Sequence, residues 1–327
     1  MHGWIILDKP HGLGSTQAVS AVKRALRTSG AGKWKVGHGG TLDPLATGVL
    51  PIAIGEATKL AGRMLDSDKI YDFTVAFGVQ TDTLDLEGKA IAQSDERPTL
   101  AQVEAMLPRF TGPIDQAPPA YSAILIDGQR AYDLARKGED VEMKLRGVTV
   151  YQLQICHPRE GGDPSPSMGT GREVREMDSR LRGNDDPMES ITLRAHVSKG
   201  TYIRSLARDI ALALGTVGHV TMLRRIKAGP FTLEAAITLD KLDQDAKGGG
   251  IGGLMLPLTA GLDDIPALPV SPDQALMLRQ GKVLTGVAAT TGLYLATHGD
   301  IPVALVRSDD DQIVVVRGFN LMSREDD

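Results

Sequence analysis

The chain of 327 residues carries a formal net charge of −5, with 42% hydrophobic and 24% charged residues. This length is enough for one large domain and a small one, each with a buried core, which excludes a peptide or a scaffold held by disulfides. The single cysteine, Cys156, excludes an internal disulfide, and no Cys or His cluster has the spacing of a zinc site. We expect no signal peptide, no membrane span and a reducing, cytoplasmic setting.

Basic residues gather in two regions although the whole chain is acidic. Residues 1–38 carry six Lys or Arg side chains against Asp8 alone, and residues 194–227 carry seven against Asp209 alone. The acidic end at 325–327 masks these clusters in the total charge. A solvated helix face would explain either cluster, but two in one chain favour binding to a phosphate backbone.

The patterning of the first part predicts alternating short strands and helices. Residues 4–9 are predicted as a strand, Ser15 as the cap of a helix through Leu26, 49–54 as a buried strand, 56–64 as a short helix and 69–77 as a strand. Tyr71 shares one face of the last strand with Phe73. Taken alone, this tyrosine is more simply explained as a core aromatic.

Residues 37–51 form the most distinctive stretch of the sequence. Four glycines and two prolines hold a single carboxylate, Asp43, in a chain that must turn tightly and keep one shape. Such rigidity suits a catalytic group, which has to be held to a fraction of an ångström. The alternative is that Asp43 simply opens a turn before Pro44.

The middle of the chain adds several turns and helices. The acidic turn at 81–88 lacks the spacing of an EF-hand, so we do not expect calcium there. Thr99 is expected to open a helix, 118–123 to be extended, Asp127-Gly128 to form a hairpin turn, 131–137 a helix and 148–155 a strand.

Residues 157–187 are predicted to be a disordered insertion, because charged residues, Gly, Pro and Ser leave no apolar periodicity. A strand at 190–197 follows, and then a helix on which Arg204 and Arg208 point the same way. The glycines at 247–254 formally match G-x-G-x-x-G, but no buried strand precedes them, so we expect a flexible connector. Residues 266–327 form a small unit with one helix and alternating strands.

Several blocks taken together resemble the TruB family of tRNA pseudouridine-55 synthases, from about Trp4 to Phe231. The blocks, which occur in this order, are 7–10 with Ser15, 37–51 with 55–59, 69–71, 118–123 and 198–204 with 223–225. Two positions depart from the family pattern: Leu125 stands where Lys is usual, and Gly14 where Thr or Ser is usual.

The resemblance implies a role for seven residues. They are Asp43 as the catalytic carboxylate, Tyr71 as the base-stacking tyrosine, Arg204 as the partner of the carboxylate, Tyr202 and Leu223 as walls of the uracil pocket, and Lys9 and His38 as contacts to the RNA. The implied fold is an α+β pseudouridine-synthase core with a mixed, mostly antiparallel sheet, plus a small C-terminal PUA-like β-rich domain. We expect the catalytic domain at 1–255 and the C-terminal RNA-binding domain at 266–327.

The implied activity is isomerisation of uridine-55 in the T loop of tRNA, with base flipping and an aspartate-dependent exchange of the glycosidic bond. The reaction adds and oxidises nothing, so we expect neither cofactor nor metal. The expected partner is the T arm of tRNA, and the protein is expected to act as a monomer without an obligatory protein partner. Two alternatives are an RNA-guided synthase of the H/ACA type and a tRNA-folding chaperone.

Overall fold

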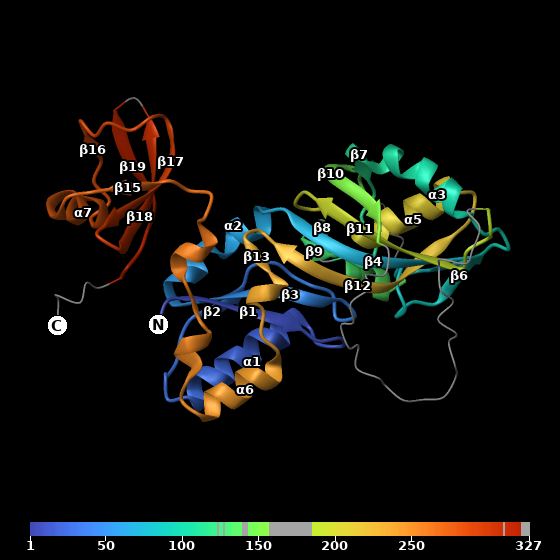
Figure 1. Cartoon of the computed structure of the whole chain (residues 1–327), viewed down its shortest axis with the longest axis horizontal. Helices are drawn as coiled ribbons and strands as arrows, with labels where there is room; N and C mark the ends of the chain where they lie inside the picture. Colours follow the sequence, from blue (N-terminus) through green and yellow to red (C-terminus); the bar gives the residue numbers. More distant parts are fainter. Residues whose placement is uncertain (123, 127, 139–142, 157–184, 310, 322–327) are drawn as a thin grey trace. The chain divides into compact units, whose positions relative to one another are not determined.

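The computed structural model describes residues 1–122, 124–126, 128–138, 143–156, 185–309 and 311–321 (Figure 1). Most of the predicted insertion, residues 157–184, therefore lies outside the described residues. The chain divides into two compact units, one made of Met1–Ser67 and Lys227–Asp327 and the other of Asp68–Ile226. None of the helices in the described part is both long and apolar enough to cross a membrane.

The first unit is built on a small antiparallel sheet. Strand β1 (Gly3–Lys9) pairs along its whole length with β3 (Thr47–Ile54). Strand β14 (Leu256–Pro257) extends the sheet beyond β1, and β2 (Val36–His38) pairs with the end of β3. The predicted strands at 4–9 and 49–54 are confirmed, and each is longer by one or two residues at its N-terminal end.

Helices α1 (Ser15–Thr28) and α6 (Leu239–Lys247) lie side by side against this sheet (Figure 1). Their apolar sides share one buried cluster with β1 and β3. Ile251, in the short η5 turn (Ile251–Leu254), joins the same cluster and is 1% exposed. The prediction of a flexible connector at 247–254 was therefore wrong, because one apolar side chain anchors it to the core.

The predicted cap of α1 was also wrong. The N-cap is Gly14, whose N–H donates to Gln17 Oε1 at 2.8 Å, and Ser15 is the first residue of the helix. Because Gln17 supplies the capping contact, the Ser15 hydroxyl is available for another partner, Leu42.

The sheet of the second unit includes four strands that pair antiparallel in turn. Strand β4 (Lys69–Phe77) pairs with β11 (Ser190–Val197), which pairs with β10 (Arg146–Ile155), and β7 (Gly112–Gln116) lies beyond β10. Phe73, Val75 and Leu193 alternate onto one face, where α5 (Ile203–Ala213) packs its apolar side. The core of this unit therefore lies between the sheet and α5.

The remaining elements complete the two units. They are η1 (Gly55–Leu60), α2 (Ala61–Asp66), β5 (Val79–Thr81), β6 (Ala90–Gln93), α3 (Leu100–Met106), η2 (Leu107–Phe110), β8 (Leu125–Ile126), β9 (Gln129–Arg130), α4 (Ala131–Arg136), β12 (Gly218–Ala228), β13 (Phe231–Thr232), η4 (Leu233–Ala235) and η6 (Leu258–Gly261). Thr99 caps α3 as predicted. Strands β8 and β9 form the predicted hairpin, although Asp127 itself lies outside the described residues.

A separate β-rich sheet lies near the end of the chain. Its strands run in the order β15 (Ala267–Pro269), β17 (Gly292–His298), β18 (Ile301–Asp309), β19 (Gln312–Gly318) and β16 (Leu284–Thr285), with α7 (Pro272–Arg279) packed on them. Only the β15–β17 pair is parallel among the described pairings of this sheet. The α+β class with a β-rich C-terminal sheet is confirmed, whereas the domain limits 1–255 and 266–327 stay a prediction.

Glu56 fastens the C-terminal sheet to the turn that follows β3. Its Oε2 accepts hydrogen bonds from Lys59 Nζ at 2.7 Å and from the Asn320 N–H at 2.6 Å, and Lys59 Nζ also donates to the Gly318 carbonyl at 2.9 Å. Beside this contact Phe319 is buried in a cluster that contains Trp4. Burial alone would raise the pKa of Glu56, but the bonds from Lys59 and Asn320 outweigh it and lower the pKa.

We predict that Leu206→Ala lowers the free energy of unfolding by about 3 kcal/mol, because it opens a cavity in the core under α5. The matched control is Leu212→Ala on the same helix, where the side chain is 51% exposed. This control should change the free energy of unfolding by less than about 0.5 kcal/mol in urea titrations. Equal effects at the two positions would contradict the packing described for α5.

We further predict that Glu56→Gln costs about 1 kcal/mol of stability at pH 7. Since the folded-state pKa of Glu56 is lowered, its charge stabilises the fold above the ordinary pKa of about 4.5 that the group has in the unfolded chain. That contribution is lost as the pH falls through the folded-state pKa. Urea titrations at several pH values should therefore show the two proteins converging in acid, and a constant difference would refute the assignment.

Candidate active site

The loop that carries Asp43 connects β2 to β3 in the first unit. Asp43 is half-buried, and its carbonyl accepts the Ala46 N–H at 3.1 Å, which closes a tight turn. Gly40 and Gly48 adopt φ values of 141° and 101°, a region that side chains strongly disfavour. The glycines of this stretch therefore shape the backbone around the carboxylate, as the sequence predicted.

Two side chains hold the loop on either side of Asp43. The Ser15 hydroxyl accepts the Leu42 N–H and donates to the Leu42 carbonyl, both at 2.9 Å. Lys9 is fully buried, and its Nζ donates to the carbonyls of Leu13 at 2.7 Å and Pro44 at 3.1 Å. The residues immediately before and after Asp43 are thus tied to α1 and to the end of β1.

The expected RNA contacts of Lys9 and His38 stay predictions. Lys9 has 0% exposure and contacts backbone carbonyls within the loop region, so its described bonds position the chain. His38 is the last residue of β2, is half-buried and lies opposite Ile52 of β3. Both residues belong to the same compact unit as Asp43.

The other four predicted residues belong to the second unit. Tyr71 on β4 and Leu223 on β12 both pack against the core cluster that includes Ile203. Tyr202 is the N-cap residue of α5, and Arg204 follows in its first turn. Tyr202 and Arg204 thus lie together at the start of α5, and Tyr71 and Leu223 pack against the core of the same unit.

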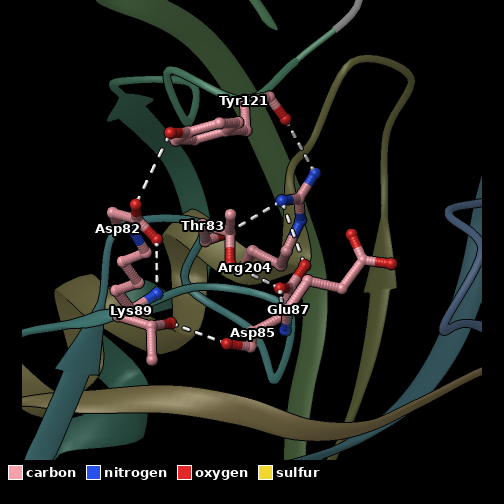
Figure 2. Close-up of polar contacts among 8 residues, drawn as sticks. Asp82, Thr83, Asp85, Glu87, Lys89, Tyr121 and Arg204 are labelled. Carbon is pink, nitrogen blue, oxygen red and sulfur yellow. Dashed lines mark hydrogen bonds and ion pairs between the residues drawn. The ribbon is translucent and has the colours of Figure 1, made fainter. Parts of the chain in front are cut away.

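Arg204 is a nearly buried cation with several acceptors (Figure 2). Its Nη1 donates to the Thr83 carbonyl at 2.8 Å and to Asp85 Oδ2 at 3.2 Å, and its Nη2 donates to the Tyr121 carbonyl at 3.1 Å. Asp85 is itself buried. A buried charge needs such partners because the protein interior hydrates it poorly.

The turn at 81–88 is shaped to present Asp85. Asp85 Oδ1 accepts the Thr83 hydroxyl at 2.5 Å and the Glu87 N–H at 3.0 Å, which leaves Oδ2 directed at Arg204. Leu84 takes the left-handed φ of 63°, which is unusual for a leucine. A Cβ at Gly88 would overlap Asp82 and Thr83, so the turn requires glycine there. The turn is therefore strained and tightly packed beside a predicted site residue.

Sequence reasoning missed Asp85. It tested the acidic turn only as a calcium loop, and it assigned the basic residues at 194–227 to the RNA surface. Arg204 and Arg225 are in fact buried, and Arg194 makes a bidentate pair with Asp72 at 2.6 and 2.8 Å. Arginines that alternate with apolar residues along strands and a helix could have indicated that some of them need internal acidic partners.

The first unit offers an oriented carboxylate, and the second unit offers a tyrosine and a buried guanidinium. Within the described residues, no three His, Cys, Asp or Glu side chains gather closely enough to hold a metal ion. Carboxylates can act as nucleophile, as base or as a stabiliser of positive charge, and an aromatic ring offers a face to a nucleobase.

Comparison with known proteins gives the family. A family model described as "TruB family pseudouridylate synthase (N terminal domain)" matches residues 23–165, and one described as "tRNA pseudouridylate synthase B C-terminal domain" matches 204–261. The chain is 60% identical over 319 residues to "tRNA pseudouridine synthase B" of Novosphingobium aromaticivorans, covering 98% of this chain and 97% of that protein. The chain belongs to the TruB family of pseudouridylate synthases. It is therefore an enzyme that isomerises uridine to pseudouridine.

Two further comparisons fit this assignment. The protein of the same name from Zymomonas mobilis is 55% identical, over 98% of this chain and 96% of its own length. Among solved structures, a chain of the "Crystal Structure of a Cbf5-Nop10-Gar1 Complex" matches with a TM-score of 0.68 and 24% identity, covering 99% of this TruB-family chain and 86% of that one. This structural likeness supports the fold alone.

We predict that Asp85→Asn lowers the free energy of unfolding by about 2 kcal/mol, because Arg204 keeps its charge and loses its anionic partner. Misplacement of the guanidinium should also slow pseudouridine formation roughly 10- to 100-fold. The control is Glu87→Gln in the same turn, where the side chain is exposed and the N–H to Asp85 is retained. Urea titration measures the stability and a pseudouridine assay measures the rate. A fully active Asp85→Asn enzyme would show that Asp85 does not support catalysis.

Proposed function

We propose that this TruB-family enzyme converts uridine-55 in the T loop of tRNA to pseudouridine. The tRNA substrate is supported by relatives named tRNA pseudouridine synthase B that match nearly the whole chain. The position in the T loop rests on the family resemblance of the sequence blocks. The observation that carries the proposal is the Asp43 loop, a half-buried carboxylate held on both sides by Lys9 and Ser15.

The reaction breaks the bond between N1 and C1′, rotates the uracil and joins C5 to C1′. The C5 proton leaves, a proton returns to the freed nitrogen, and nothing is oxidised, so the proposed reaction uses no cofactor. We assign Asp43 to the sugar, where it acts as nucleophile, as base or as a stabiliser of developing positive charge. Its rigid loop suits each of these roles, because each requires one oxygen at a fixed place.

The residues of the second unit are assigned to the base. A uridine inside a folded loop has to be flipped out before its glycosidic bond can be reached. Tyr71 offers a ring face for stacking, and Tyr202 and Leu223 offer apolar walls. From the family resemblance we also propose Arg204 as the partner of the Asp43 carboxylate. Asp85 holds the Arg204 guanidinium in place.

The favoured form of the enzyme is a monomer in the cytoplasm that needs no guide RNA or protein partner. Identity with proteins named tRNA pseudouridine synthase B favours this form over the RNA-guided alternative. The same relatives, named as synthases, favour catalysis over a purely RNA-folding role.

We predict that Asp43→Asn abolishes pseudouridine formation, by a factor of roughly 10⁴ or more, while the affinity for RNA changes little. The assay incubates the purified chain alone with unmodified tRNA and maps pseudouridine. The control is Asp240→Asn, an exposed carboxylate at the start of α6. Retained activity in Asp43→Asn would reject the catalytic assignment, and a requirement for added guide RNA would favour the alternative.

A further inference from the structure

Gln116 is a buried glutamine at the end of β7. Its side chain lies on the same face of the strand as Ile114, which packs against the core under α5. Gln116 Oε1 accepts the N–H of Tyr202 at 2.8 Å. This bond fixes the orientation of the carboxamide, because the opposite orientation would set an NH₂ donor against the Tyr202 donor.

The NH₂ group of Gln116 has no matching acceptor among the residues that the structure describes. The residue is 1% exposed, and Nε2 has no hydrogen-bond partner among the residues that the structure describes. Buried donors in native proteins nearly always have a partner, because an unmatched donor loses the free energy of its hydration and gains no bond in return. A buried donor retained beside an active-site helix is therefore suited to an acceptor supplied by a ligand.

The surrounding backbone holds this donor firmly in place. Ser205 Oγ and Arg208 Nη2 both donate to the Ala117 carbonyl, at 2.8 and 3.1 Å, and Arg204 Nη2 donates to the Tyr121 carbonyl. The segment from Gln116 to Tyr121 is thus bound to the first two turns of α5. The donor has little freedom to turn away, which is the preorganisation that a binding group requires.

We propose that Gln116 Nε2 donates a hydrogen bond to a carbonyl oxygen of the flipped pyrimidine. The inference rests on the proposed function, in which Tyr202 lines the uracil pocket. A neutral, buried donor suits an uncharged base carbonyl, whereas phosphate oxygens remain near water and are usually met by charged side chains. Uracil offers carbonyls at C2 and C4, and cytosine carries an amino group at C4. A donor placed at O4 would therefore also exclude cytidine.

The test combines a variant of the enzyme with substitution of single atoms in the substrate. Gln116→Met removes the donor and keeps a side chain of similar length. Stem-loops carry uridine, 2-thiouridine or 4-thiouridine at the target position, because sulfur is a weaker acceptor than oxygen. We expect sulfur at the contacted carbonyl to slow the wild-type enzyme on the order of tenfold and to have no further effect on Gln116→Met. Sulfur at the other carbonyl should affect both enzymes equally.

Two additional variants separate recognition from structure. Ser205→Ala loosens the same segment without touching the carboxamide, so it should respond to sulfur as the wild type does. Gln116→Glu keeps an oxygen for Tyr202 and loses the donor at pH 8, and protonation of the glutamic acid should restore a donor and part of the rate in acid. This second variant also covers the case in which Gln116→Met does not fold.

The outcomes distinguish this inference from the proposed function. If the wild type is active on uridine and both thio-substitutions slow Gln116→Met as much as the wild type, the inference is wrong and the function stands. The inference is equally wrong if the rate of Gln116→Glu does not rise in acid by more than the rate of Ser205→Ala does. A wild-type chain that is inactive on the uridine stem-loop would reject the proposed function, and this inference with it.

Discussion

The second unit is organised by the need to solvate one buried guanidinium. Arg204 cannot be hydrated at its position, so the protein supplies acceptors from segments that are far apart in sequence. The turn before β6 contributes the Thr83 carbonyl and Asp85, and the segment after β7 contributes the Tyr121 carbonyl. Each of these acceptors constrains the backbone that carries it. The positive φ of Leu84 is understandable as the local cost of aiming one turn at this charge.

The first unit carries the Asp43 carboxylate on a loop that side-chain bonds hold in place. Lys9 and Ser15 fix the peptide groups on either side of Asp43. A fully buried lysine that donates to backbone carbonyls resembles a structural ion more than a surface charge. In the first unit, backbone hydrogen bonds from Lys9 and Ser15 stiffen the Asp43 loop. In the second unit, a charge pair with Asp85 holds Arg204.

Much of this arrangement could be predicted from the sequence. Alternation of apolar residues gave the strands that carry Tyr71 and follow Asp43, and the helical spacing after Tyr202 gave α5. Local pattern failed where a side chain had a distant partner. Ser15 is a residue type that often caps helices, but its hydroxyl bonds to Leu42. Asp85 lies in an acidic turn, but it pairs with Arg204 on a helix more than a hundred residues later. Such partners depend on tertiary packing, which periodicity does not encode.

The contact between Glu56 and Asn320 has a consequence for how the chain can be divided. Leu295 and Leu305 of the C-terminal sheet, and Phe319 just after its last strand, share a buried cluster with Trp4 on β1. A chain shortened before this sheet would leave part of that cluster facing water and would be prone to aggregate. The C-terminal sheet therefore covers apolar side chains of the sheet that leads to the Asp43 loop. The sequence of the C-terminal sheet is thus constrained by solubility as well as by any contact with RNA.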